Sequence, residues 1–586
     1  MDSRTLRRKV RYQLKSIAFL TAILLLFPMF LSETPYRALA ESGGIKVYCN
    51  GILYGSTAYI DTASGVAMVP IGMLESIPGL RLDIRDNQAW FALYGRQLTT
   101  TMGSDSYVLD GQQHHWRHGL EPWQYGTAAP GRDLLEALGA SVRWEASEPA
   151  LYITIPVQNP SVPTNVSPAA EPMHLAFIHE SQLWLLNVNQ PEAQPQPVST
   201  QNVDQIIGWS HDGQWLAYLQ RQDKEKYVGD LSLWVVRSDG QQSQCLKEVP
   251  VSEGTPEWSP VDNVIAYQTF KSWDDNTFEE SLRLAQLDQG RWQDRQLLNT
   301  SNRWLGVGLT WFPDGQSLAF SWMRDGKNVA TVERMDRQGR SSRIYTQSPD
   351  QAGSMEDGIY AREMDGLKLS PDGRYLAYFS GMNAASLNAD QMTLQVVDLQ
   401  NPGTPFTAGS ALGYPQWLAW SPDSRQLAFI AGTGRVASCE KGLNLLTIDK
   451  GQFQVRDFSQ PGMVDARPFW NESGTALYIS RGQESEAWEQ EGRHFEVPVL
   501  GQYICLGQKA EALSFPQADQ ADYPLSLSPD GKFLAFERLD YCDLGSLYLL
   551  NLQDGKPIKI LDKLEVNAGY YGNFYPDGVS IYWTQS

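Results

Sequence analysis

Short apolar runs alternate with tight-turn residues along most of this chain, and one ten-residue phrase recurs through its second and third thirds. The phrase has an aromatic residue or Leu, then Ser-Pro-Asp-Gly or a variant, then an apolar run such as Leu-Ala-Tyr. The eight copies begin at Trp209, Trp258, Trp311, Leu369, Trp420, Trp470, Leu527 and Phe574. They are spaced 47 to 58 residues apart, which is the length of one four-stranded propeller blade.

The turn chemistry of the phrase explains its residues. Pro371 presets φ for the first corner of a tight turn, Asp372 can accept a hydrogen bond from the backbone two residues on, and Gly373 accepts positive φ. A strand begins after the turn, and a second hairpin follows in most repeats. Two hairpins per repeat make four antiparallel strands. The pattern therefore predicts a mainly β fold for residues 174–586, an eight-bladed β-propeller, with seven blades as the alternative.

The two ends of the repeat region are incomplete. Residues 174–200 carry strand patterns without a preceding turn phrase, and the last copy stops after Trp583. We expect the two ends to combine into one blade, which would tie the first strands to the last. The predicted strands number one more than eight blades require.

The front of the chain indicates where the protein works. A basic segment that contains Arg7, Arg8 and Lys9 precedes an apolar run from Ile17 to Leu31, and Ala38-Leu39-Ala40 follows. This order is typical of a signal peptide over residues 1–40. An uncleaved signal anchor is the alternative. In either case we expect an extracytoplasmic protein, either secreted or associated with the cell envelope.

A second domain is predicted over residues 45–155, and it too is duplicated. The segment Val-Tyr-Cys-Asn-Gly at 47–51 recurs 60 residues later as Tyr-Val-Leu-Asp-Gly, and Pro70 recurs at the same offset as Pro130. Each Pro precedes a short helical pattern, at 73–77 and 134–138, and an extended segment follows each helix. Two hairpin–helix–hairpin units are expected, forming a small α+β module.

The module resembles the copper amine oxidase N-terminal-like domain, a stalk domain of exported bacterial proteins. The resemblance rests on the two segments above, on Met-Val-Pro-Ile at 68–71 and on the run from Leu134 to Trp144. It implies an accessory stalk, not copper or oxidase chemistry. Residues 156–173 hold five Pro in 18 residues, which predicts a semi-extended linker between stalk and propeller.

Charge narrows the possible partners. The formal net charge is -20, and removal of residues 1–40, with seven basic and two acidic side chains, makes it -25. Such an acidic body disfavours binding to nucleic acid and to anionic lipid. Membrane contact is expected only through a retained N-terminal segment. The five Cys residues are an odd and sparse set, so they predict no disulfide framework.

One histidine cluster is a candidate metal site. His114 and His118 would share a face of a strand and could approach one ion from the same side. The cluster has no well-spaced Cys or carboxylate partner, however, and an ordinary polar strand is the simpler interpretation. We therefore expect no metal and no cofactor.

The repeat region resembles the TolB-like family, propellers built from Pro-Asp-Gly repeats that also occur in prolyl oligopeptidases and dipeptidyl peptidases. This resemblance implies the fold, whereas the architecture serves many functions. The first hypothesis is an exported, non-catalytic binding or scaffold protein with a protein or cell-wall partner. The alternative is a hydrolase or lyase with carboxylates at the channel mouth, although no Gly-x-Ser-x-Gly nucleophile motif is present.

Two acidic inserts are the candidate ligand surface, because the repeated Asp residues are explained by turns. The inserts span 350–366 and 483–522. The candidate residues are Glu356, Asp357, Glu363, Asp365, Glu484, Glu486, Glu489 and Glu491.

Overall fold

The computed structural model describes residues 44–584 with gaps. The gaps longer than three residues are 156–159, 163–172, 189–192, 222–230, 270–278, 348–362, 382–388, 485–498, 506–510 and 569–573. The predicted signal segment 1–40 lies outside the described residues. Within the part that is described, no helix is long and apolar enough to cross a membrane.

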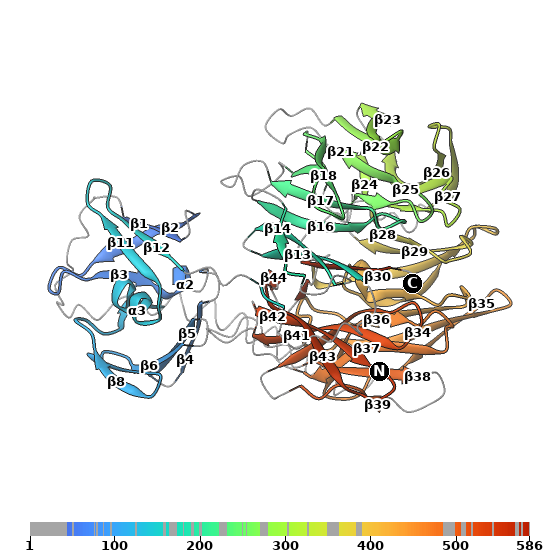
Figure 1. The fold of residues 1–586 in the computed structure, drawn as a ribbon. Helices are drawn as coiled ribbons and strands as arrows, with labels where there is room; N and C mark the ends of the chain where they lie inside the picture. Colours follow the sequence, from blue (N-terminus) through green and yellow to red (C-terminus); the bar gives the residue numbers. More distant parts are fainter. Residues whose placement is uncertain are drawn as a thin grey trace, which may run out of the picture.

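Two sheets and two short helices form the N-terminal module (Figure 1). The larger sheet has the spatial order β11 (Ser141–Glu145), β12 (Ala150–Thr154), β1 (Ile45–Cys49), β2 (Ile52–Ile60), β3 (Ala67–Pro70), β10 (Gly126–Pro130) and β9 (Glu121–Trp123). The smaller sheet has the order β4 (Leu80–Arg85), β5 (Gln88–Leu93), β6 (Arg96–Thr101), β7 (Ser106–Leu109) and β8 (Gln112–His115). The helices are α2 (Ile71–Leu74) and α3 (Gly131–Ala137).

The two sequence copies of this module meet at the antiparallel pair of β3 and β10. Val69 lies opposite Ala129, and Pro70 lies opposite Ala128, so the register pairs equivalent positions of the two copies symmetrically. Both helices begin immediately after the Pro, earlier than the predicted patterns at 73–77 and 134–138. The reason is that Pro has a fixed φ suited to the start of a helix and lacks only a hydrogen-bond donor that the first turn does not need.

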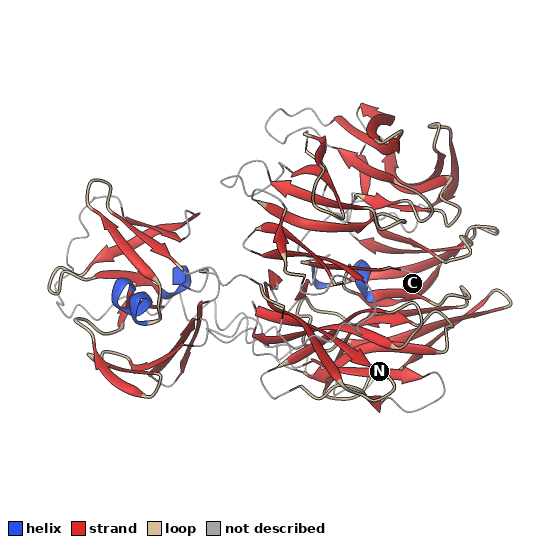
Figure 2. Ribbon diagram, viewed as in Figure 1, coloured by secondary structure: helices blue, strands red, loops and turns tan. Residues whose placement is uncertain are grey.

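Within 173–583 the described residues form four-stranded antiparallel sheets, as predicted (Figure 2). The described part contains eight of them. Sheet 1 consists of β46 (Val579–Trp583), β13 (Met173–His179), β14 (Gln182–Asn187) and β15 (Gln196–Pro197), and sheet 2 of β16 (Val203–Trp209), β17 (Trp215–Arg221), β18 (Leu231–Arg237) and β19 (Ser243–Lys247). Sheet 3 consists of β20 (Glu257–Trp258), β21 (Val264–Thr269), β22 (Glu279–Asp288) and β23 (Arg291–Ser301), and sheet 4 of β24 (Trp304–Trp311), β25 (Ser317–Arg324), β26 (Lys327–Asp336) and β27 (Ser341–Thr346). Sheet 5 consists of β28 (Glu363–Leu369), β29 (Tyr375–Gly381), β30 (Met392–Asp398) and β31 (Phe406–Ala411), and sheet 6 of β32 (Leu418–Trp420), β33 (Gln426–Ala431), β34 (Gly442–Asp449) and β35 (Gln452–Asp457). Sheet 7 consists of β36 (Met463–Trp470), β37 (Ala476–Gln483), β38 (Val499–Cys505) and β39 (Glu511–Ala512), and sheet 8 of β40 (Ala521–Leu527), β41 (Phe533–Tyr541), β42 (Leu544–Asn551) and β43 (Pro557–Glu565). A short 3-10 helix, Pro415–Trp417, precedes β32.

Sheet 1 joins the two ends of the repeat region. β46 pairs with β13 in a register that places Met173 opposite Trp583. On the other side, the apolar side chains of sheet 1 pack against those of sheet 8, with Phe177 and Phe533 in one buried cluster. The sequence predicts one strand more than eight four-stranded sheets need, and the structure accounts for it. β45 (Phe574–Tyr575) pairs with β44 (Asn567–Ala568) in a separate two-stranded sheet.

The repeated turn phrase has the hydrogen bonds that its residues predict. In sheet 5, the backbone N–H of Arg374 donates to Asp372 Oδ1 at 3.0 Å, and the N–H of Tyr375 donates to Ser370 Oγ at 2.9 Å. Gly373 has φ +70°. The same bond to the Asp from the residue two positions later recurs at Asp212, Asp314, Asp423 and Asp530. These aspartates are therefore turn residues.

The aromatic residue that opens the phrase links neighbouring sheets. Trp420 donates its indole N–H to the carbonyl oxygen of Lys368 in the preceding sheet at 3.2 Å, and Trp470 donates to Ala419 O at 3.0 Å. Equivalent bonds run from Trp209 to Ser580 O, from Trp258 to Gly208 O and from Trp311 to Glu257 O. Between sheets 8 and 1, Trp583, which ends the last phrase, donates instead to a side chain, Ser526 Oγ, at 3.0 Å. The indole N–H can only donate, so it needs an acceptor on the neighbouring sheet. Each bond therefore joins the strand that carries the tryptophan to a strand of that neighbouring sheet. We call each junction between neighbouring sheets a seam.

Two seams lack the tryptophan, because the phrases at Leu369 and Leu527 begin with Leu. In both places a serine of the preceding sheet supplies the bond instead. Ser321 Oγ donates to Met364 O at 2.7 Å, and Ser480 Oγ donates to Asp522 O at 2.9 Å. Both serines directly follow the three-residue apolar run of their phrase. A serine bond thus replaces the indole bond at these two seams.

We expect Trp420→Phe to lower the free energy of unfolding by about 1 kcal/mol more than Trp292→Phe. Both tryptophans have 8% of their surface exposed, so the two substitutions remove similar apolar contact. The indole N–H of Trp420 is bonded across a seam, whereas the buried N–H of Trp292 has no hydrogen-bond partner among the residues that the structure describes. Urea unfolding followed by fluorescence measures the difference, and equal losses would show that the indole bond contributes nothing.

Candidate functional site

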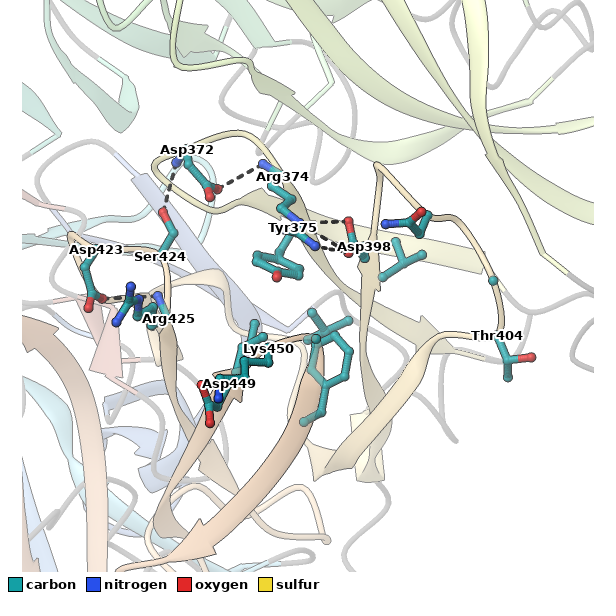
Figure 3. Close-up of a pocket in the computed structure, with 17 residues that line it drawn as sticks. Asp372, Arg374, Tyr375, Asp398, Thr404, Asp423, Ser424, Arg425, Asp449 and Lys450 are labelled. Atoms are coloured by element: carbon teal, nitrogen blue, oxygen red, sulfur yellow. Dashed lines mark hydrogen bonds and ion pairs between the residues drawn. The ribbon is translucent and has the colours of Figure 1, made fainter.

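A cleft of about 930 Å³ lies between sheets 5 and 6 (Figure 3). Its walls are the turns that join the first strand to the second and the third to the fourth in each sheet. The lining residues are Asp372, Arg374, Tyr375, Val396, Val397, Asp398, Asn401, Gly403 and Thr404 from sheet 5, and Asp423, Ser424, Arg425, Ile448, Asp449, Lys450, Gly451 and Phe453 from sheet 6.

The wall from sheet 5 carries a fixed ion pair. Arg374 Nε lies 3.1 Å from Asp398 Oδ1, and Arg374 Nη2 lies 2.7 Å from Asp398 Oδ2. This two-bond contact lowers the pKa of Asp398 and raises the pKa of Arg374. The guanidinium also lies over the ring of Tyr375, 5.0 Å from its centroid. Arg374 is therefore held in one orientation by a carboxylate and an aromatic ring.

Aromatic and aliphatic side chains form the apolar part of the cleft. Tyr375 and Phe453 meet edge to face, with ring centroids 6.1 Å apart, and Tyr375 stacks on Trp420 at 6.2 Å. Phe453 in turn stacks on Phe406 at 5.1 Å. Tyr375 and Trp420 belong to the buried cluster shared by sheets 5 and 6, and the partly buried Phe453 and Phe406 pack against it. The packed core of sheets 5 and 6 therefore holds the apolar surface of the cleft in place.

The wall from sheet 6 presents charges on turns. Asp423 is anchored in the phrase turn, since Ser421 Oγ donates to its Oδ1 at 2.6 Å. Ser424 takes the place of the glycine with φ +62°, and its hydroxyl accepts a hydrogen bond from the backbone N–H of Asp372 at 2.9 Å. That bond ties the two walls together. Arg425 and Lys450 are both exposed and add positive charge to this wall.

The chemistry of the lining is that of a binding site. Carboxylates, guanidinium and ammonium groups, hydroxyls and an apolar patch are all present, so one surface offers polar and apolar contacts to a ligand. Among the described residues that line the cleft there is neither His nor Cys.

Asp365 and Glu484, the two predicted acidic residues whose side chains are described, do not line this cleft. Asp365 is partly buried on β28, and Glu484 is exposed after β37, where its Oε1 accepts the backbone N–H of Glu440 at 2.8 Å. Glu363 belongs to β28, but its side chain is not described. Asp365 and Glu484 belong to different regions of the repeat, around sheets 5 and 7. The other five predicted positions lie outside the described residues, namely Glu356, Asp357, Glu486, Glu489 and Glu491.

The two candidate histidines have separate surroundings. His114 stacks on Tyr107, with ring centroids 5.4 Å apart. His118 follows β8, and its Nε2 lies 3.1 Å from Glu121 Oε2, while its Nδ1 lies 3.9 Å from Asp61 Oδ2. In the described part of the chain, no group of three or more His, Cys, Asp or Glu side chains is placed to hold a metal ion.

Comparison with known proteins finds distant structural likeness. No protein-family model matches the chain, and no curated protein matches it. Similar solved structures include TolB from Acinetobacter baumannii, with 14% identity over 63% of this chain and 82% of that chain and a TM-score of 0.29. Dipeptidyl peptidase 4 from Porphyromonas gingivalis has 10% identity over 68% and 60% of the two chains, with a TM-score of 0.44. A structure from a study of two prolyl endopeptidases has 13% identity over 62% of this chain and 50% of that chain, with a TM-score of 0.40. The chain thus spans about half the length of that endopeptidase chain.

Proposed function

We propose that this protein is an exported, non-catalytic binding or scaffold protein. Its eight four-stranded sheets serve as the blades of a TolB-like propeller, preceded by a copper amine oxidase N-terminal-like stalk and a signal segment. Its partner is a protein or a component of the cell envelope. The cleft between sheets 5 and 6 carries this proposal, because it combines a preoriented Arg374–Asp398 pair with an apolar floor and exposed charges.

Preorganisation is the physical reason why this cleft favours binding. A ligand that meets fixed side chains loses less free energy to the ordering of the site than one that meets flexible loops. The cleft is bounded by short turns whose aspartates are hydrogen-bonded to their own backbone. Its apolar floor is part of a packed core.

Site-specific photo-crosslinking in intact cells tests the proposal. A benzoylphenylalanine at Thr404, which is exposed on the cleft rim, is expected to trap a discrete partner. The same group at Lys556 is the matched control, because Lys556 is exposed on the equivalent turn of sheet 8. Equal trapping at both positions, or none at Thr404, would contradict a binding role for the cleft. Turnover of a peptide substrate by the purified protein would contradict the non-catalytic role.

A further inference from the structure

Sheets 5 and 6 carry an arginine at the same position of the repeat. Arg374 and Arg425 each follow the phrase Asp by two residues and directly precede the second strand. Neighbouring repeats with the same arginine allow a direct internal comparison. What differs is the residue that the third strand places opposite.

In sheet 5 the arginine has a carboxylate partner supplied by the strand register. Tyr375 lies opposite Asp398, and Asp398 binds the adjacent Arg374 through two bonds. In sheet 6 the equivalent pair is Gln426 opposite Thr447. Sheet 6 therefore keeps the arginine but has a hydroxyl where the carboxylate would be.

The arginine of sheet 6 is left open to a ligand. Across the described part of the chain, the guanidinium of Arg425 has no hydrogen bond and no ion pair with a side chain, and the same holds for the ammonium of Lys450. Both residues line the cleft and are exposed. A guanidinium presents paired donors whose geometry matches a carboxylate.

We propose that the cleft binds a carboxylate side chain of a partner protein, with Arg425 as the group that receives it. This inference rests on the proposed binding function and names its ligand chemistry. The ligand carboxylate takes the role that Asp398 has in sheet 5. An apolar residue beside that carboxylate packs against Phe453 and Ile448, which line the same cleft.

The carboxylates of the cleft limit which anions fit. Asp423 and Asp449 lie on the same wall as Arg425, and the whole chain has a net charge of -20. A ligand with several negative charges would be repelled by both. A protein segment that carries one acidic residue between apolar ones meets the arginine and the apolar floor without a second anionic group.

Two capped pentapeptides provide the probe, one with a central Glu between two Phe residues and one with Gln in its place. The purified chain without the predicted signal segment is titrated with fluorescently labelled forms of both. We expect the Glu peptide to bind about fivefold more tightly than the Gln peptide, which is the upper range for an exposed ion pair. The preference should shrink as salt is added, because salt screens exposed charges. Arg425→Gln is expected to abolish the preference. Arg456→Gln is the matched control, since Arg456 lies on β35 outside the cleft lining and should leave the preference intact.

A second variant tests the same point with the arginine retained. Thr447→Asp restores the carboxylate of sheet 5 at the equivalent register position, so Arg425 gains an internal partner and the Glu preference should fall as it does in Arg425→Gln. Equal affinity for both peptides, lack of binding by either, or an unchanged preference in both variants overturns the carboxylate inference. Crosslinking at Thr404 decides the proposed function separately, because it needs no assumption about ligand charge.

Discussion

Replacement of Asp465 by Asn should lower the free energy of unfolding by about 3–5 kcal/mol, because it breaks a fully buried ion pair. Asp465 and Arg481 each have 1% of their side-chain surface exposed. Arg481 Nη2 lies 2.8 Å from Asp465 Oδ2, and that oxygen also accepts the backbone N–H of Leu443 at 2.8 Å. Without the carboxylate, the charged guanidinium remains buried among neutral acceptors, such as the carbonyl oxygen of Phe458, which lies 2.9 Å from Arg481 Nη2.

A more exposed ion pair supplies the control for this prediction. Asp204 and Arg221 form an ion pair between the first and second strands of sheet 2, and their side chains are 21% and 25% exposed. Water can therefore solvate Arg221 when Asp204 is replaced, and Asp204→Asn should cost about 1 kcal/mol or less. Urea unfolding of both variants, followed by tryptophan fluorescence, makes the comparison. Losses of similar size would show that burial does not set the contribution of these pairs.

The fold was accessible to sequence reasoning because its determinants are local. The turn at Asp372 and Gly373 needs only a few consecutive residues, and the structure has the expected backbone hydrogen bond and positive φ there. The spacing of the repeats and the two hairpin patterns within each of them then predicted four-stranded sheets. Sheet 1 also follows the expectation that the two ends combine, because β46 completes the sheet begun by β13.

The seam bonds were not predicted, because they depend on pairs of residues in different repeats. Trp420 and Lys368 are 52 residues apart in sequence, and the residues around Trp420 do not indicate which group accepts its hydrogen bond. The sequence does hold a signal that would have helped. Serine follows the apolar run of the phrase at Ser321 and Ser480, directly before the two repeats whose phrase begins with Leu. Aligning the repeats against their neighbours would have linked these positions.

The cleft was missed for a related reason. Charged residues are most concentrated in the long acidic inserts, whereas Arg374, Arg425 and Lys450 lie in short turns that resemble ordinary surface. Only the meeting of two sheets brings these turns together. A repeat alignment would have shown a carboxylate at Asp398 and a hydroxyl at Thr447, which is the difference on which the ligand proposal depends.

Glu537 should make the stability of the protein fall as the pH rises from about 4.5 to about 7. Its side chain is buried, with 1% of the residue exposed, and burial raises its pKa from 4.5 to about 7, an increase that the charge of Arg467 partly offsets. In this pH window the folded protein holds a proton that the unfolded chain releases. Folding is therefore favoured at the lower end, and the contribution is lost as the pH passes 7.

Glu537→Gln removes this dependence, because an amide is neutral at every pH. The free energy of unfolding, measured in urea at pH 5 and pH 8, should fall between these values by about 3 kcal/mol more in the wild type than in the variant. Glu472→Gln is the control, since Glu472 is exposed in the phrase turn of sheet 7 and should behave as the wild type does. A wild-type pH dependence in Glu537→Gln would mean that Glu537 is already ionised in the folded protein, with Arg467 stabilising the charge more than burial opposes it.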